Sequence, residues 1–237
     1  MKVIIMAGFG GLLLGLSLLL RRELRERKPG RYHPRPAWLL AGIWFCLSML
    51  LAAGLQVEHL LRQPLVRPGQ WQNPVWLLFT LLCLAAIGVA YRVIWRAGTF
   101  TDGRPWRPVA STFFGMMWGM SQGLIMLSFW QLAIRAGTGP VGTAAIGWAG
   151  LALYFPLFQS FFWDLYVSPP HNLRAWNVRK ILGCHVPNLT FSMFWLAAGA
   201  NYLLVVLLQV FVLTAAARAM HIPARGDDYE APRGQER

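Results

Sequence analysis

The chain has 237 residues, of which 56% are hydrophobic and only 13% are charged, and this balance excludes an ordinary soluble domain. The formal net charge is +13, but the apolar residues come in long blocks that leave no soluble module for binding nucleic acid. The composition therefore indicates an all-α, polytopic integral membrane protein.

Six segments are long and apolar enough to cross a bilayer core, which takes about 20 residues of helix. They are Val3–Leu20, Ala37–Leu55, Pro74–Trp95, Val109–Ile134, Val141–Phe162 and Leu189–Ala217. The last is long enough to tilt or to extend beyond the membrane. We therefore predict one bundle of about six transmembrane helices over residues 1–217, followed by a polar, disordered tail over 218–237.

The first segment is expected to remain in the mature protein as a membrane anchor. Its apolar run ends without a small-residue cleavage site and is followed by RRELRERK, residues 21–28. A basic stretch directly after an apolar run is a stop-transfer pattern, whereas a cleaved signal peptide ends in small residues.

The basic residues of the loops predict the orientation of the bundle. Loops 21–36, 96–108 and 163–188 hold seven, three and three Lys or Arg residues, and the other side has only Lys2, Arg62, Arg67 and Arg135 before the tail. Because basic loops stay in the cytoplasm, the first set is predicted to be cytoplasmic, in a bacterial-type inner or cytoplasmic membrane. Both termini are then predicted to lie outside.

Glycines spaced by four residues mark faces on which membrane helices can approach closely. Gly11 and Gly15 form one such pair, and Gly115, Gly119 and Gly123 form a double one. A face of this kind serves either as an interface to another subunit or copy, or, more commonly, as a packing surface within the bundle.

Tryptophan is abundant, with twelve residues in the chain. Many lie near the ends of the predicted spans, where an interfacial aromatic belt is expected. Five lie deeper: Trp44, Trp118, Trp130, Trp148 and Trp195. Side chains of this kind are usually core or lipid-facing residues, and less often line a cavity for a flat ligand such as a pigment, a quinone or an isoprenoid.

The stretch SPPHNLRAWNVRKILGCHVPNLT, residues 168–190, is the most polar one between two apolar blocks. Its prolines and asparagines predict two successive helix starts. Asn172 is a suitable N-cap for a short amphipathic helix over Leu173–Cys184 on the cytoplasmic face. Pro187 is expected to end that helix, and Asn188 to cap the last span.

Two histidines of this stretch, His171 and His185, are not explained by helix capping. Each could act alone as the axial ligand of a haem or a chlorophyll-type pigment, and the alternative is structural hydrogen bonding. The neighbouring side chains that would contact such a cofactor are Asn172, Arg174, Trp176 and Asn188.

A different arrangement follows if the loop folds back. A continuous helix would hold the two histidines about 20 Å apart, but a folded loop could bring Asp164, His171 and His185 together. Two histidines and a carboxylate can bind a single divalent metal ion. A His–Asp pair could also perform acid–base catalysis on a lipid headgroup.

Three classes of function remain open. The first is a subunit or scaffold of a larger membrane complex, in contact with a pigment, quinone, haem or lipid and with other subunits or a second copy. The second is an enzyme on a lipid or isoprenoid, with Asp164, His171 and His185 as its catalytic candidates. The third is a channel or carrier, with a polar path along Gln122, Gln159, Asn201 and Gln209. The spans carry no acidic or basic group at mid-depth, which disfavours the third class.

Overall fold

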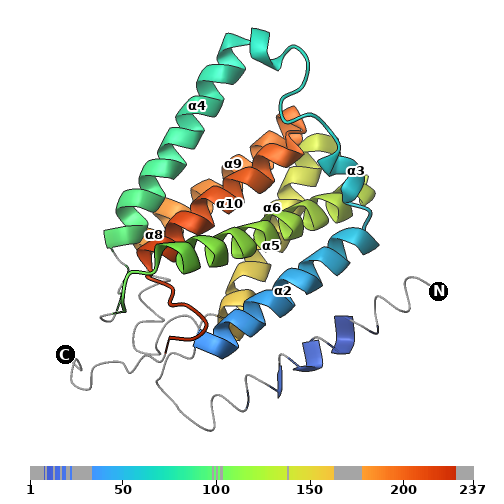
Figure 1. Ribbon diagram of the computed structural model, residues 1–237. Helices are drawn as coiled ribbons and strands as arrows, with labels where there is room; N and C mark the ends of the chain where they lie inside the picture. The colour runs from blue at the N-terminus through green and yellow to red at the C-terminus, as the bar shows by residue number, and fades with distance from the viewer. Residues whose placement is uncertain are drawn as a thin grey trace.

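A computed structural model of the chain describes residues 34–97, 99, 101, 104–137, 139–162 and 178–227, together with scattered residues between 8 and 22. The side chains of residues 155–162 lie outside this description. Within the described part all regular structure is helical, and the helices pack as one bundle (Figure 1).

The described residues form the following helices in chain order. Their bounds are α2 (Pro34–Gly54), α3 (Glu58–Leu61), η1 (Gln70–Gln72), α4 (Pro74–Val89), η2 (Ala90–Trp95), α5 (Pro108–Arg135), α6 (Gly139–Phe162), α8 (Val178–Lys180), η4 (Ile181–His185), α9 (Val186–Phe194), η5 (Trp195–Gly199) and α10 (Tyr202–Ala219). The segments η2, η4 and η5 are π-helical and continue the α-helices beside them.

Four helical runs among the described residues are long and apolar enough to cross a membrane. They are Pro34–Gly54, Pro74–Trp95, Val178–Gly199 and Tyr202–Ala219. The first two agree with predicted spans. The all-helical fold is confirmed for the described residues, and the four apolar helices are compatible with a polytopic membrane bundle. The predicted fourth and fifth spans form α5 and α6, which are 28 and 24 residues long but are not among the four.

The predicted last span, Leu189–Ala217, is wrong as a single helix. Ala200 adopts a left-handed conformation, with φ 47° and ψ 41°. The amides of Ala200 and Asn201 donate to the carbonyls of Leu196 and Trp195, both at 3.2 Å, and close the end of the first helix. Because a left-handed residue ends a helix, the chain turns here and returns as α10, so 178–219 is a helical hairpin.

Pro187 does not end a helix, contrary to the sequence-based prediction. Val186, directly before it, has helical angles, φ −62° and ψ −49°, and the helix runs through from Val178 to Gly199. A proline removes one amide donor and crowds the carbonyl four residues earlier. The π-helical turn η4, directly before Val186, widens the helix at that place. The amphipathic helix predicted to stop at Cys184 is thus part of a longer helix.

The centre of the bundle is the contact between α5 and α10, and α5 also packs on α2 and α6 (Figure 1). Three glycines of α5 lie against the backbone of α10. A Cβ atom at Gly115, Gly119 or Gly123 would meet Thr214, Val210 or Val206, respectively. The spaced glycines therefore face another helix of the same chain. At Gly11 and Gly15, by contrast, nothing among the described residues lies within 4 Å of such an atom.

The chain after α10 folds back onto the beginnings of α2 and α5. The indole Nε1 of Trp38 donates to the carbonyl of Pro223 at 2.9 Å, and Ser111 Oγ donates to that of Ile222 at 2.9 Å. We call this end of the bundle the Trp38 end. The C-terminal end of α10 thus lies beside the beginning of α2, not at the opposite end as expected from six spans.

The boundary predicted for the tail, at residue 218, is also too early. Residue 218 is still within α10, and Met220 and Ile222 are buried. The described structure continues to Asp227, and residues 228–237 lie outside it.

Candidate functional site

Most of the site residues predicted from the loop fall outside the described part of the chain. These are Asp164, His171, Asn172, Arg174 and Trp176. The convergence of Asp164, His171 and His185 therefore stays a prediction. Among the described residues, no group of three or more His, Cys, Asp or Glu side chains is placed to hold a metal ion.

The two predicted residues that are described, His185 and Asn188, lie where two π-helical segments meet. The segment η4 packs against η2, which ends the helix that begins with α4. The helices approach closely at Gly183, where a Cβ atom would lie 2.7 Å from the Ile94 side chain. Cys184 Sγ lies 3.5 Å from the carbonyl of Ala90. Because π-helical turns are rare and frequent at functional sites, this contact is a candidate site.

Lys180 is the most unusual residue of this contact, since its side chain is only 2% exposed. Its Nζ donates to Thr99 Oγ1 at 3.1 Å and lies 4.4 Å from the ring centroid of Trp95. An ammonium over an indole face is attracted by the ring quadrupole, and more strongly where water is absent. In the sequence, Lys180 is only one of the three basic residues counted in loop 163–188. In the structure its side chain is buried.

Trp95 links Lys180 to the histidine. Its ring stacks on Tyr91, with 5.6 Å between centroids, and meets His185 edge-on at 5.5 Å. Trp95 itself is only 1% exposed, so it belongs to the core rather than to an interfacial belt. We call the four residues Tyr91, Trp95, Lys180 and His185 the Lys180 cluster.

Asn188 does not cap a helix but pairs with an amide of α10. Its Nδ2 donates to Gln209 Oε1, and Gln209 Nε2 donates to Asn188 Oδ1, both at 3.0 Å. Gln209 also donates to Ser192 Oγ at 3.2 Å. All three side chains are buried. The pair holds the two helices of the hairpin together deep in the bundle.

A second amide pair holds the turn of the hairpin, at the opposite end from Trp38. Asn201 Nδ2 donates to Gln70 Oε1 at 2.8 Å and to the carbonyl of Leu65 at 3.0 Å. Gln70 Nε2 donates to the carbonyl of Gly199 at 3.2 Å. The loop before α4 is thereby fastened to the turn. We call this end of the bundle the Gly199 end.

The two amide pairs involve Asn201 and Gln209, which were predicted to line a polar path for a carrier. Gln209 and Asn201 lie on that path in the sequence, but each is satisfied by a different partner in a different part of the bundle. Gln122 is buried on α5, and the side chain of Gln159 lies outside the described part.

The buried polar residues of the helix 178–199 recur about every four positions, which places them along one face. They are Lys180, Cys184, Asn188, Ser192 and Trp195, whose Nε1 donates to Thr80 Oγ1 at 3.3 Å. Their partners belong to other helices or connections: Thr80 on α4, Ala90 in η2, Thr99 a few residues after η2, and Gln209 on α10. Residue type alone drew attention to Asn188 and Trp195 on this face and to the neighbouring His185, but not to Lys180 or Ser192. The spacing of 180, 184, 188 and 192 was the available signal.

The fold and this face define a class: the described residues form an all-helical bundle that includes four helices long and apolar enough to cross a membrane and is held together by buried polar contacts. Comparisons of the chain with protein-family models, with curated proteins and with solved structures found no match.

Proposed function

We propose that this chain is a multi-pass integral membrane protein that serves as a non-catalytic subunit or scaffold of a larger membrane complex. The observation that carries the proposal is the use of its buried polar side chains. Asn188, Gln209 and Ser192 bond to one another, and Asn201 bonds to Gln70. Side chains engaged in this way fix helices, whereas a catalytic or transport site needs groups that can turn to a substrate.

The outer face of α4 supports this proposal. Five large apolar side chains on it are each more than half exposed: Val75, Leu78, Leu81, Leu82 and Val89. A face of this kind is suited to lipid or to a helix of another subunit. In Figure 1, α4 lies at the edge of the bundle.

We further propose that the Trp38 end faces the cytoplasm. The basic loops 21–36 and 96–108 flank α2 and α5 at this end, and basic loops stay on the cytoplasmic side. The hairpin then brings Arg218 and Arg225 to the same side.

Native mass spectrometry of the protein, isolated from its own membranes in mild detergent, tests the subunit proposal. We expect foreign subunits in fixed stoichiometry, and an optical spectrum of the same fraction reports any haem, pigment or quinone. A photo-reactive residue at Leu82, on the outer face of α4, should cross-link to such a subunit. The matched control is Ile87, which is 1% exposed and should cross-link only within the chain. A particle of this chain alone, without cross-links from Leu82, would contradict the proposal.

A second candidate function, an enzyme acting on a lipid or isoprenoid, is favoured by the Lys180 cluster. An amine, an imidazole and a phenol lie around one indole there, and these are acid–base groups. Lipid analysis of membranes carrying Lys180→Met or His185→Ala tests it. A substrate that accumulates in both variants, at unchanged thermal stability of the protein, would favour the enzyme over the scaffold.

A further inference from the structure

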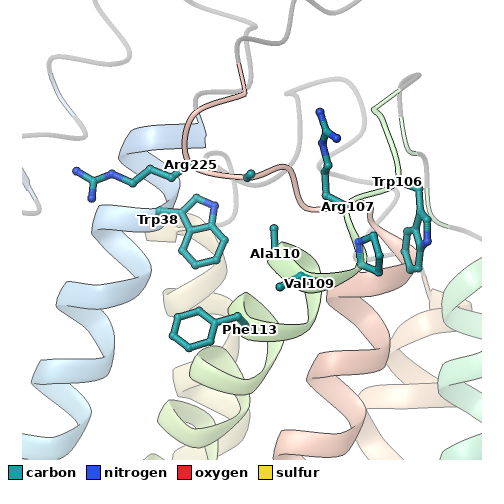
Figure 2. Close-up of a pocket in the computed structure, with 9 residues that line it drawn as sticks. Trp38, Trp106, Arg107, Val109, Ala110, Phe113 and Arg225 are labelled. Atoms are coloured by element: carbon teal, nitrogen blue, oxygen red, sulfur yellow. The ribbon is translucent and has the colours of Figure 1, made fainter.

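A pocket of about 620 Å³ opens at the Trp38 end of the bundle. It lies where α2 and α5 begin and where the chain continues after α10 (Figure 2). Its floor is formed mainly by Trp38, Val109, Ala110 and Phe113, and its polar side chains are Arg107 and Arg225. The arginines stand on opposite sides of the aromatic floor in Figure 2.

The wall formed by the chain after α10 is held in place from several directions. Beside the bonds of Trp38 and Ser111 to Pro223 and Ile222, the carboxylate of Asp227 accepts from the amide of Ala224 at 3.1 Å. Binding to a site that is already formed avoids the cost of ordering the chain. The pocket is therefore preorganised for a ligand.

The charges at the rim favour an anion. Arg107 Nε is bonded to Asp227 at 3.2 Å, and the Arg107 side chain is still 53% exposed. Arg225 is exposed and has no acidic partner in the described part of the chain. Among the described residues, the two guanidinium groups outnumber the one carboxylate, so this part of the rim is positively charged. Guanidinium is well suited to phosphate.

The floor indicates what kind of anion fits. Val109 is 82% exposed and Phe113 63% exposed, both next to the start of α5. Trp38 stacks on Phe113 with 6.1 Å between ring centroids. A free inorganic anion would leave this apolar surface in contact with water, whereas a molecule with a phosphate and long apolar chains would cover it.

We infer that this pocket binds an anionic phospholipid of the surrounding leaflet. Its phosphate lies between Arg107 and Arg225, and its acyl chains run along Val109 and Phe113 toward the membrane core. Basic residues at the membrane surface attract anionic lipids in this manner, and tryptophan is favoured at the same depth. The inference holds for a scaffold and for an enzyme alike, since neither role uses this pocket.

Native mass spectrometry of the delipidated full chain, titrated with dioleoylphosphatidylglycerol or with dioleoylphosphatidylcholine, tests the inference. We expect the unchanged chain to bind phosphatidylglycerol more tightly than phosphatidylcholine. The double variant Arg107→Gln, Arg225→Gln should bind phosphatidylglycerol about tenfold more weakly, because each basic residue raises the affinity for an anionic lipid severalfold. The matched control is the pair Arg62→Gln, Arg67→Gln, which removes two exposed arginines from the Gly199 end. This control should bind phosphatidylglycerol as the unchanged chain does.

Two further variants separate the pocket from a general surface attraction. Ala110→Trp fills the floor without changing the charge, and Val109→Asp places a negative charge on an outward position that takes no part in the core. Both should lose the tight phosphatidylglycerol site. Equal binding of the two lipids would overturn the inference. An equal loss in the control pair, or full affinity in a folded Ala110→Trp or Val109→Asp variant, would overturn it as well.

Discussion

The amides of Asn188 and Gln209 bond to each other in both directions, each at 3.0 Å, across the two helices of a hairpin. The pair is buried, so neither amide has water as an alternative partner. It accounts for two residues that the sequence offers as functional candidates, and it makes the packing of α9 on α10 specific.

Removing both members of this pair should cost less than the two single removals added together. Gln209→Met leaves the amide of Asn188 buried without its partner, and such a loss costs about 1–3 kcal/mol. The double variant Asn188→Leu, Gln209→Met replaces both amides by apolar groups and should be less destabilised than the sum of the single variants. Thermal unfolding in detergent, followed by circular dichroism, measures the three values. Strict additivity would show that the amides act independently.

The glycines of α5 predict a sharp difference between two Gly→Ala substitutions. At Gly119 the new methyl group would collide with the backbone of Val210, and backbone cannot yield as a side chain can, so we expect a loss of about 1–3 kcal/mol or more. Gly42 of α2 has nothing within 4 Å. There, alanine should be neutral or should stabilise by up to about 1 kcal/mol through helix propensity. Unfolding midpoints of the two variants, compared in the same detergent, test the contrast.

The hairpin turn predicts two substitutions of opposite sign at adjacent residues. Ala200 has φ 47°, which costs a residue with a Cβ atom about 1–2 kcal/mol, so Ala200→Gly should raise the unfolding temperature. A methyl group at Gly199 would overlap the Asn201 side chain and break its bond to Gln70. Gly199→Ala should therefore lower the unfolding temperature. The same sign for both changes would contradict this geometry of the turn.

The burial of Lys180 predicts its chemical reactivity. Acylation of its amine requires local opening of the contact with Trp95 and Thr99, so labelling of the folded protein should be more than about tenfold slower than in denaturing detergent. Arg179→Lys provides the control, because residue 179 is exposed one position away. Mass spectrometry of proteolytic peptides reports both sites. Equal labelling rates at 179 and 180 would place Lys180 at the surface.

Sequence reasoning succeeded where a helix has clear ends. The apolar block Pro74–Trp95 predicted the third span, and the structure explains its beginning, because the side chain of Asn73 accepts from the amides of Val75 and Trp76, both at 3.1 Å. The apolar run of α4 and η2 then has the length of one crossing, and the structure ends it at Trp95 as predicted.

The same reasoning failed for the hairpin, for physical reasons that can be named. The run Leu189–Ala217 has no proline or charge to interrupt it, and the break at Gly199–Asn201 rests on one left-handed alanine and on bonds from Gln70, a residue far away in sequence. The length of 29 residues was the usable signal, since about 20 suffice to cross the bilayer core. The prediction that Pro187 ends a helix was wrong because a π-helical turn accommodates the proline.

The candidate site was predicted only in part. His185 and Asn188 stood out by residue type, but Lys180, Trp95 and Gln209 take their roles from contacts between distant helices. A single sequence carries no record of such contacts. The spacing along one helix predicts a shared face but not the helix that packs on it.

The most direct test of this account is the side of the membrane on which residue 225 lies. In a chain without its three cysteines, Arg225→Cys, Arg107→Cys and Arg67→Cys are labelled in sealed vesicles with a membrane-impermeant maleimide. The hairpin places residue 225 at the Trp38 end with residue 107, because the nearby Asp227 forms an ion pair with Arg107. Residues 225 and 107 should therefore be labelled from one side of the membrane, and residue 67 from the other. Labelling of 225 together with 67, and not with 107, would mean that residues 178–219 cross the membrane once and would contradict the fold on which the site and the pocket rest.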